Sequence, residues 1–307
     1  LTAAEWRFSS PAERKLEERL RDLPSLGKIA DNIFEGLHTS ADKVYTIRII
    51  EDQGTLVRAY SRSKKKEYIL EKDLLRPLLM GKDIRRWVSD NTDLLVIFPY
   101  KIKNGKAFLI DEKGFKAQYP RTWKYLSDNK AELEKRDRGA WKGRSDWYAY
   151  GRRQNLEQFD QPKIIMKVLA DKPCFTLDFD GKFYFVGGGN AGGYGIVLER
   201  ASTEDLRYFC ALLNSSLSDW QIRKIGSRFR GGFYSYGKRF SEKLIMRIPE
   251  KGERIKLSIR DKINSLVEEI VAHKRAEREY LQLWNYWSVK LKGNEYVLGK
   301  ILESDFE

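Results

Sequence analysis

Residues 223–239 combine the side chains that most clearly predict chemistry in this sequence of 307 residues. Cations, aromatic rings and glycines occur together along the segment, and no acidic residue interrupts it. Lysine and arginine neutralise phosphates, glycine permits a close backbone approach, and aromatic rings stack on bases or wedge between them. The segment therefore predicts contact with DNA. The alternative is a solvated basic loop whose rings turn inward.

The residues of this segment divide into two predicted roles. The candidates for contact with phosphates are Arg223, Lys224, Arg228, Arg230, Lys238 and Arg239. The candidates for contact with bases, by stacking or by wedging, are Phe229, Tyr234 and Tyr236.

A second group of candidate base contacts follows an aromatic run at residues 147–150. It comprises Arg152, Arg153, Gln154 and Asn155. Arginine can bridge the edge of guanine, and glutamine or asparagine can pair with adenine. His38, in a loop of glycine, threonine and serine, is a further candidate for a hydrogen bond to a ligand. The alternative for the group is aromatic packing in which the arginines cap the edge of a sheet.

The sequence lacks the signatures of common catalytic sites, so we expect no catalytic residue and no metal site in it. It contains neither a phosphate-binding P-loop nor a nucleophile elbow. Gly187, Gly189 and Gly192 match the dinucleotide-binding pattern, but a strand-like stretch follows them where a helix is required. The match therefore favours a glycine-rich loop between strands. Cys174 and Cys210 have no metal-ligand spacing and indicate two reduced core cysteines.

A metal-dependent nuclease is the enzymatic alternative. Such an enzyme needs carboxylates on neighbouring strand ends to hold Mg²⁺, and a lysine to assist the attacking water. Asp160, Asp180 and Lys182 can be arranged in that form, and Asp171 can replace Asp160. Asp180 and Gly181, however, also predict a hairpin turn. An RNA-binding protein is a third possibility, which the basic and aromatic segment would serve equally.

An adenine methyltransferase holds the amine of a flipped base with an Asn/Asp-Pro-Pro-aromatic loop. The eight prolines here include no Pro-Pro pair, so any activity of that kind must lie outside this sequence. The first residue is Leu1 rather than methionine, from which we expect the sequence to be a piece of a longer chain.

The composition indicates a folded, basic protein. The sequence has 58 Lys and Arg against 44 Asp and Glu, a formal net charge of +14. Because 41% of the residues are hydrophobic, the chain has enough to bury, and disorder does not explain the charge. No apolar run is long enough to span a membrane and no signal-peptide core is present. We therefore expect no membrane partner and a cytoplasmic location.

Strand and helix signals together predict an α+β fold. Apolar runs predict strands at 44–47, 94–99, 107–110, 163–168, 174–179 and 182–186. The turn signals Asn104-Gly105 and Asp180-Gly181 each predict a hairpin between the flanking strands. Ser10 and Ser202 each predict the start of a helix, because an acidic residue follows three positions later.

The segment from Thr122 to Arg136 also has a helical pattern. A long C-terminal helix is predicted from Ile255 onward, where one stripe of positions follows alternating steps of four and three. The stripe comprises Ile255, Ile259, Ile263, Leu266, Ile270, His273, Glu277, Tyr280, Trp284 and Trp287. Such a heptad seam predicts one long helix that packs against the body or a neighbouring domain and can be separated from the body.

Five short segments, in this order, resemble the TaqI-like C-terminal specificity domain of adenine-specific DNA methyltransferases and fused type IIG restriction-modification enzymes. They are 36–45, 74–84, 147–155 with 162–165, 211–215 and 243–249. The resemblance covers nearly the whole chain up to Pro249. One departure is Thr39-Ser40, where the family often has Thr-Gly.

The resemblance implies a target-recognition domain that grips double-stranded DNA while the methyltransferase catalytic domain of the same parent chain flips and methylates adenine. It implies a mixed twisted sheet with flanking helices and a long C-terminal helix. We expect the recognition domain at 1–250 and a helical spacer at 251–307. S-adenosyl-L-methionine is expected to bind only to the catalytic domain of the parent. Base-reading residues differ between members, so the recognised bases do not follow from the resemblance.

Overall fold

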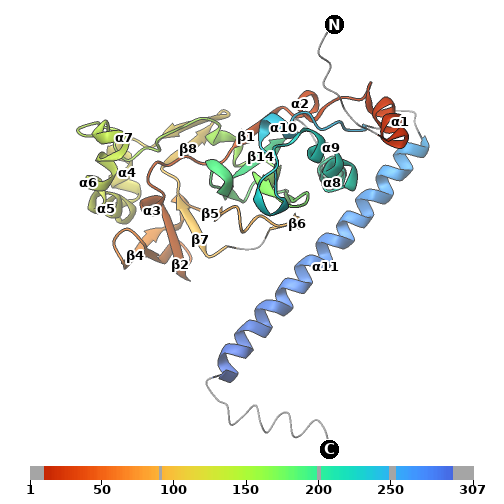
Figure 1. Cartoon of the computed structure of the whole chain (residues 1–307). Helices are drawn as coiled ribbons and strands as arrows, with labels where there is room; N and C mark the ends of the chain where they lie inside the picture. Colours follow the sequence, from red (N-terminus) through yellow and green to blue (C-terminus); the bar gives the residue numbers. More distant parts are fainter. Residues whose placement is uncertain (1–9, 90–91, 199–201, 249–253, 293–307) are drawn as a thin grey trace, which may run out of the picture.

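Two mixed β-sheets, flanked by helices, form the body of the protein (Figure 1). The computed structural model describes residues 10–89, 92–198, 202–248 and 254–292. Each sheet contains one parallel pair among antiparallel ones. The α+β fold and the long C-terminal helix predicted from the sequence are confirmed, although the described strands divide between these two sheets and two further sheets of two strands each, β8-β9 and β11-β15.

The six-stranded sheet has the order β13-β5-β7-β2-β3-β4. Its strands are β2 (Thr46–Asp52), β3 (Leu56–Ser61), β4 (Lys66–Glu71), β5 (Leu75–Leu79), β7 (Leu94–Ile97) and β13 (Tyr184–Phe185). Five short helices lie at this end of the body (Figure 1): α3 (Asp42–Tyr45), α4 (Glu112–Gln118), α5 (Pro120–Asp128), α6 (Lys130–Glu134) and α7 (Arg136–Gly139).

The five-stranded sheet has the order β1-β14-β10-β12-β6. Its strands are β1 (Asn32–Glu35), β6 (Trp87–Val88), β10 (Lys163–Lys167), β12 (Phe175–Asp178) and β14 (Gly193–Val197). Three helices pack against it: α8 (Thr203–Leu213), α9 (Ser216–Ile225) and α11 (Arg254–Lys292). The remaining elements are α1 (Pro11–Leu20), α2 (Leu26–Ile29), α10 (Lys238–Ser241), β8 (Tyr100–Lys103), β9 (Lys106–Leu109), β11 (Leu169–Ala170), β15 (Tyr234–Ser235) and the 3₁₀ turns η1 (Lys72–Leu74), η2 (Leu156–Gln158), η3 (Gly189–Ala191) and η4 (Arg230–Gly232).

The five-stranded sheet separates two hydrophobic cores. Successive residues of a strand point to opposite faces. Accordingly, Phe34 and Ile165 contribute to the core shared with the six-stranded sheet, whereas Ile33 and Ile164 contribute to the core shared with the helices. Both faces of this sheet are therefore buried, and its strands are short apolar runs.

A buried ion pair lies at the end of this sheet and redirects the chain. The Nζ of Lys163 lies 2.6 Å from Oδ2 of Asp178, and neither side chain is more than 2% exposed. Asp178 also accepts hydrogen bonds from the backbone N–H groups of Lys182 and Phe183 (2.9 and 3.0 Å). Burial lowers the pKa of Lys163, and the nearby carboxylate of Asp178 opposes this shift.

The predicted hairpin at Asp180-Gly181 is wrong. The turn joins β12 to β13, which belong to different sheets, because the contacts of Asp178 carry the chain out of the five-stranded sheet. The hairpin at Asn104-Gly105 exists, but it joins β8 to β9 rather than residues 94–99 to 107–110. The apolar run of β7 pairs instead with β2 and β5 inside the six-stranded sheet.

The long helix α11 packs on the body mainly through residues outside the predicted seam, although Ile263 of the seam contacts the second core. Val267 and Val271 are buried in the second core, whereas Leu266 and Tyr280 are 48% and 74% exposed. A strict seven-residue repeat drifts by about 20° per heptad around a straight helix. The predicted stripe therefore winds away from the body, and the expected boundary at 250/251 lies outside the described residues.

Because α11 shares the second core, we expect it to be part of the body rather than a separable spacer. Replacing both Val267 and Val271 with alanine should lower the free energy of unfolding by about 3 kcal/mol, since four buried methyl groups are removed. Urea denaturation followed by circular dichroism measures this change.

The matched control replaces Ile259 and Leu266, two exposed residues of the same helix. These changes should alter stability by less than about 1 kcal/mol. Equal effects of the two double variants would show that α11 is not needed by the core.

Candidate nucleic-acid interface

A hollow of about 230 Å³ unites two sets of residues that lie far apart in the sequence. His38 from the loop after β1 faces the same space as Arg152, Gln154 and Asn155 from the segment before η2. Glu35, at the end of β1, completes the polar part of the lining. The structure thus brings together most of the second group of predicted base contacts, which the sequence could not place relative to His38.

Backbone hydrogen bonds hold three segments around this hollow. Leu37 donates its N–H to the carbonyl of Phe185, and Gly187 donates to the carbonyl of Leu37 (both 2.8 Å). On the other side, Arg152 donates its N–H to the carbonyl of His38 (3.1 Å). The loop that carries His38 is therefore fixed on both sides by its neighbours.

Two glycines allow these segments to approach. A Cβ on Gly187 would lie 2.4 Å from the carbonyl oxygen of Gly36 and 2.6 Å from Nε2 of His38. A Cβ on Gly36 would lie 2.3 Å from the backbone of Val186. The interpretation of residues 187–192 as a glycine-rich loop between strands is confirmed, since they connect β13 to β14.

Ser40 ends the His38 loop in the left-handed backbone region, with φ of +57°. Glycine adopts this region most readily, and other residues do so at some cost. This chain has Ser40 where the family often has glycine, but its backbone keeps the left-handed turn that glycine favours.

Arg136 fixes the backbone of two segments that continue into the hollow, at Thr39 and Ala149, and sequence reasoning missed it. Its buried guanidinium donates to the carbonyls of Thr39 (3.1 Å), Ala149 (2.7 Å) and Leu133 (2.8 Å). Burial lowers the pKa of Arg136. The residue stands in a basic stretch whose other members are exposed or half-buried, so no local pattern singles it out.

The polar side chains that line the hollow differ in whether they already form hydrogen bonds or ion pairs within the chain. Nε2 of His38 lies 3.0 Å from Oε2 of Glu35, but the angles at these two atoms do not allow a hydrogen bond between them. Asn155 accepts a hydrogen bond from Asn32 (3.1 Å). Arg152 is exposed and makes no side-chain hydrogen bond or ion pair with another described residue.

Gln154 and Arg153 behave differently from each other. Gln154 is exposed at the hollow and, within the described ranges, its side chain has no hydrogen-bond partner. Arg153 does not line the hollow and forms an ion pair with Asp146. Together with Arg144, Arg153 holds the pKa of Asp146 well below its usual value. Besides the buried Nε2 of His38, the hollow therefore offers the exposed, unengaged side chains of Arg152 and Gln154.

The predicted phosphate contacts fall into two sets. Four of them are exposed and form no ion pair with another described residue: Arg228, Arg230, Lys238 and Arg239. The other two are engaged within the chain. Arg223 lies 3.0 Å from Asp219, and Lys224 lies 2.8 Å from Glu17.

The three aromatic candidates of the basic segment also differ in access. Phe229 is 37% exposed and remains able to meet a ligand. Tyr234 is half-buried, with the guanidinium of Arg223 4.9 Å from the centre of its ring. Tyr236 is 1% exposed and packs in the second core against Phe175. The predicted base-stacking role of Tyr236 is therefore wrong, because its ring fills the core.

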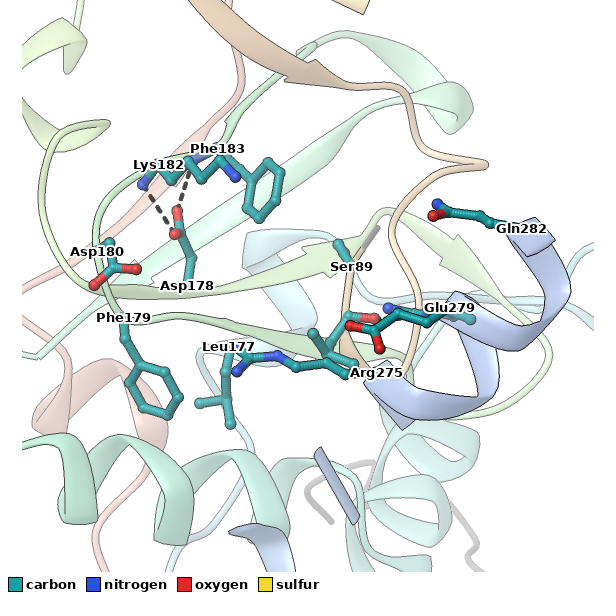
Figure 2. Close-up of a pocket in the computed structure, with 12 residues that line it drawn as sticks. Ser89, Leu177, Asp178, Phe179, Asp180, Lys182, Phe183, Arg275, Glu279 and Gln282 are labelled. Carbon is teal, nitrogen blue, oxygen red and sulfur yellow. Dashed lines mark hydrogen bonds between the residues drawn. The ribbon is translucent and has the colours of Figure 1, made fainter. Parts of the chain in front are cut away.

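The carboxylates of the nuclease alternative have different surroundings, although the backbone of Asp160 lies against Gly181. Asp180 and Lys182 line a separate hollow of about 290 Å³, and Figure 2 shows Asp178 turned toward the chain at Lys182 and Phe183. Asp178 forms the ion pair with Lys163, and Asp160 accepts a hydrogen bond from the hydroxyl of Tyr184 (2.5 Å). No group of three His, Cys, Asp or Glu side chains in the described part of the chain is arranged to hold a metal ion.

Comparison with known proteins relates the chain to restriction-modification enzymes. The Escherichia coli protein "Type II restriction enzyme and methyltransferase RM.Eco57I" is 29% identical over 241 residues. The match covers 73% of this chain and 24% of that protein, so the chain spans about a quarter of the length of this relative. No protein-family model matches the chain.

The close contact at Gly187 gives a testable expectation. Gly187→Ala should lower the free energy of unfolding by about 1–3 kcal/mol, because the added methyl group meets backbone and the His38 ring. Thermal denaturation measures the change. Gly237→Ala is the matched control, since its nearest contacts for a Cβ are at 3.5 Å or more. Equal stability of the two variants would show that the three segments separate easily.

Proposed function

We propose that this chain is the target-recognition domain of a longer restriction-modification protein and binds duplex DNA in a sequence-dependent way. The observation that carries the proposal is the hollow at which Glu35, His38, Arg152, Gln154 and Asn155 meet. The homology to a restriction enzyme and methyltransferase supports it independently.

The side chains at the hollow suit the edges of base pairs in the major groove. Arginine bridges O6 and N7 of guanine, glutamine or asparagine pairs with N6 and N7 of adenine, and a carboxylate accepts from N4 of cytosine. Arg152 and Gln154 can make such contacts without giving up an internal hydrogen bond. We therefore assign base reading first to these two residues.

The exposed cations of the basic segment suit the phosphate backbone. Arg228, Arg230, Lys238 and Arg239 have no carboxylate partner in the described ranges, so contact with phosphate would not cost an existing ion pair. Phosphate contacts set the register of a protein on duplex DNA but do not read sequence. The formal net charge of +14 favours the same partner.

The catalytic activity of the parent protein is proposed to reside outside this chain. We propose an adenine-specific DNA methyltransferase domain on the same parent chain as its partner, with S-adenosyl-L-methionine bound there and not here. The relative is named as both a restriction enzyme and a methyltransferase and is about four times as long as the matched region. Among the described residues, no helix combines the length and apolar character needed to cross a membrane.

If the hollow reads bases, removing the side chains of Arg152 and Gln154 should weaken the preference of the chain for its DNA sequence. Arg152→Ala with Gln154→Ala should leave the fold intact and relax one or two positions of the recognised sequence. The expected cost is about 1–3 kcal/mol for each side chain that makes a bidentate pair with a base. Selection from a library of randomised duplexes, followed by sequencing, measures the preference.

The control for this experiment is Lys103→Ala with Lys106→Ala on the β8–β9 hairpin, which removes charge from another exposed surface. It should keep the wild-type motif. An unchanged motif in the hollow variant would place base reading elsewhere. Failure of the wild-type chain to enrich any duplex sequence would contradict the proposed function, and preference for structured RNA would favour the RNA-binding alternative.

Phosphate contact by the basic segment predicts a change in salt dependence. Replacing Arg228, Arg230, Lys238 and Arg239 with alanine should reduce the slope of log affinity against log salt by about 3.6, which is four contacts at about 0.9 each. All duplex sequences should weaken nearly equally. An unaltered slope in a folded variant would identify the segment as a solvated loop.

A further inference from the structure

A basic cleft of about 560 Å³ lies between α11 and the edge of the five-stranded sheet. Its cations come from three different parts of the chain: Arg85, Arg86, Lys167, Lys274 and Arg278. Glu277 is the one acidic residue among the described residues that line it. Among the described lining residues, cations therefore outnumber carboxylates by four, a cluster that the sequence did not reveal because the contributing segments are distant.

Internal contacts hold several of these cations in place. Lys274 pairs with Glu277 at 2.6 Å, so the carboxylate of this cleft is already engaged with one of its lysines. Arg278 donates to the carbonyl of Val88 (2.6 Å), and Arg86 donates to the carbonyl of Asn214. A carbonyl is a neutral partner, so the hydrogen bond to Asn214 fixes the guanidinium of Arg86 without cancelling its charge.

The cleft is continuous with the rest of the proposed interface. Lys167 is the last residue of β10, and the strand that follows, β11, pairs with β15 inside the basic segment. Val168 donates to the carbonyl of Gly192, at the end of the glycine-rich loop that packs against His38 (3.2 Å). Lys167 therefore stands where the basic segment, the glycine-rich loop and the cleft meet.

The segment that carries Arg85 and Arg86 is held against the same loop. Gly81 donates its N–H to the carbonyl of Ala191 (3.1 Å), and a Cβ on Gly81 would lie 2.4 Å from that oxygen. Three elements thus bring their cations to one end of the five-stranded sheet.

We propose that this cleft binds the phosphodiester backbone of the same DNA whose bases the hollow reads. This inference rests on the proposed function and adds a second phosphate-binding surface to it. A nucleic-acid strand is favoured over a free anion because the positive charge extends beyond the cleft along the basic segment. Helix α11 thereby becomes part of the DNA-binding surface.

Lysine acetylation, read by mass spectrometry on the full chain with and without saturating duplex DNA, tests the proposal. Bound DNA should slow the acetylation of Lys167 and Lys274 at least severalfold. Lys103 and Lys106 serve as internal controls, because they lie on the β8–β9 hairpin, away from α11 (Figure 1). Their acetylation should not change.

The outcomes separate the inference from the proposed function. Protection of Lys238 without protection of Lys167 and Lys274 would overturn the cleft and leave the proposed function standing. Protection of no lysine by any duplex would overturn the proposed function itself. Equal protection by tripolyphosphate at the same phosphate concentration would identify a site for free anions and overturn the assignment to DNA.

A matched pair of variants gives a second readout. Lys167→Ala with Lys274→Ala should reduce the salt slope of duplex binding by about 0.9–1.8, because Lys167 contributes one phosphate contact at about 0.9 and Lys274, which pairs with Glu277, contributes at most one more. Lys103→Ala with Lys106→Ala removes the same charge and should leave the slope unchanged. Equal slopes in the two variants would overturn the proposal.

Discussion

The close approach of three backbone segments is the constraint on which the proposed interface depends. Gly36, Gly187 and Gly151 have neighbours at distances that no Cβ would tolerate, and the nearest atoms are mostly backbone or the adjoining loop. Backbone hydrogen bonds then fix the His38 loop between the other two segments. Polar side chains projecting from so constrained a junction are held in place before a ligand arrives, which favours specific recognition.

The layered core explains why this junction lies where it does. Both faces of the five-stranded sheet are buried, one against the six-stranded sheet and the other against α8, α9 and α11. Its edges and ends are therefore the parts free to carry polar function. The hollow and the basic cleft both adjoin the sheet there. The glycine-rich loop of residues 187–192 contacts His38 at one end and Val168, next to Lys167, at the other.

Charge is divided between structural and surface roles in this protein. Lys163 and Arg136 are buried and satisfied by Asp178 and by backbone carbonyls, so they stabilise the fold. Arg228 and Arg230 are exposed without carboxylate partners in the described ranges. Phosphate contacts position a protein on DNA and base contacts specify sequence. The proposed division between the basic surfaces and the hollow follows this distinction.

Local sequence patterns determined several strands, such as β7, β10 and β12, the serine helix starts, the glycine-rich loop and the basic segment without carboxylates. These features depend on backbone sterics, periodicity and composition within a few residues. Local patterns did not determine that Val44 and Tyr45, in a predicted strand, belong to the short helix α3. Only the tertiary structure decided that Asp180-Gly181 crosses between sheets, that Tyr236 is buried, that α11 packs through Val267, and that His38 meets Arg152. Each of these depends on pairing between segments distant in the chain, for which neighbouring residues carry no signal.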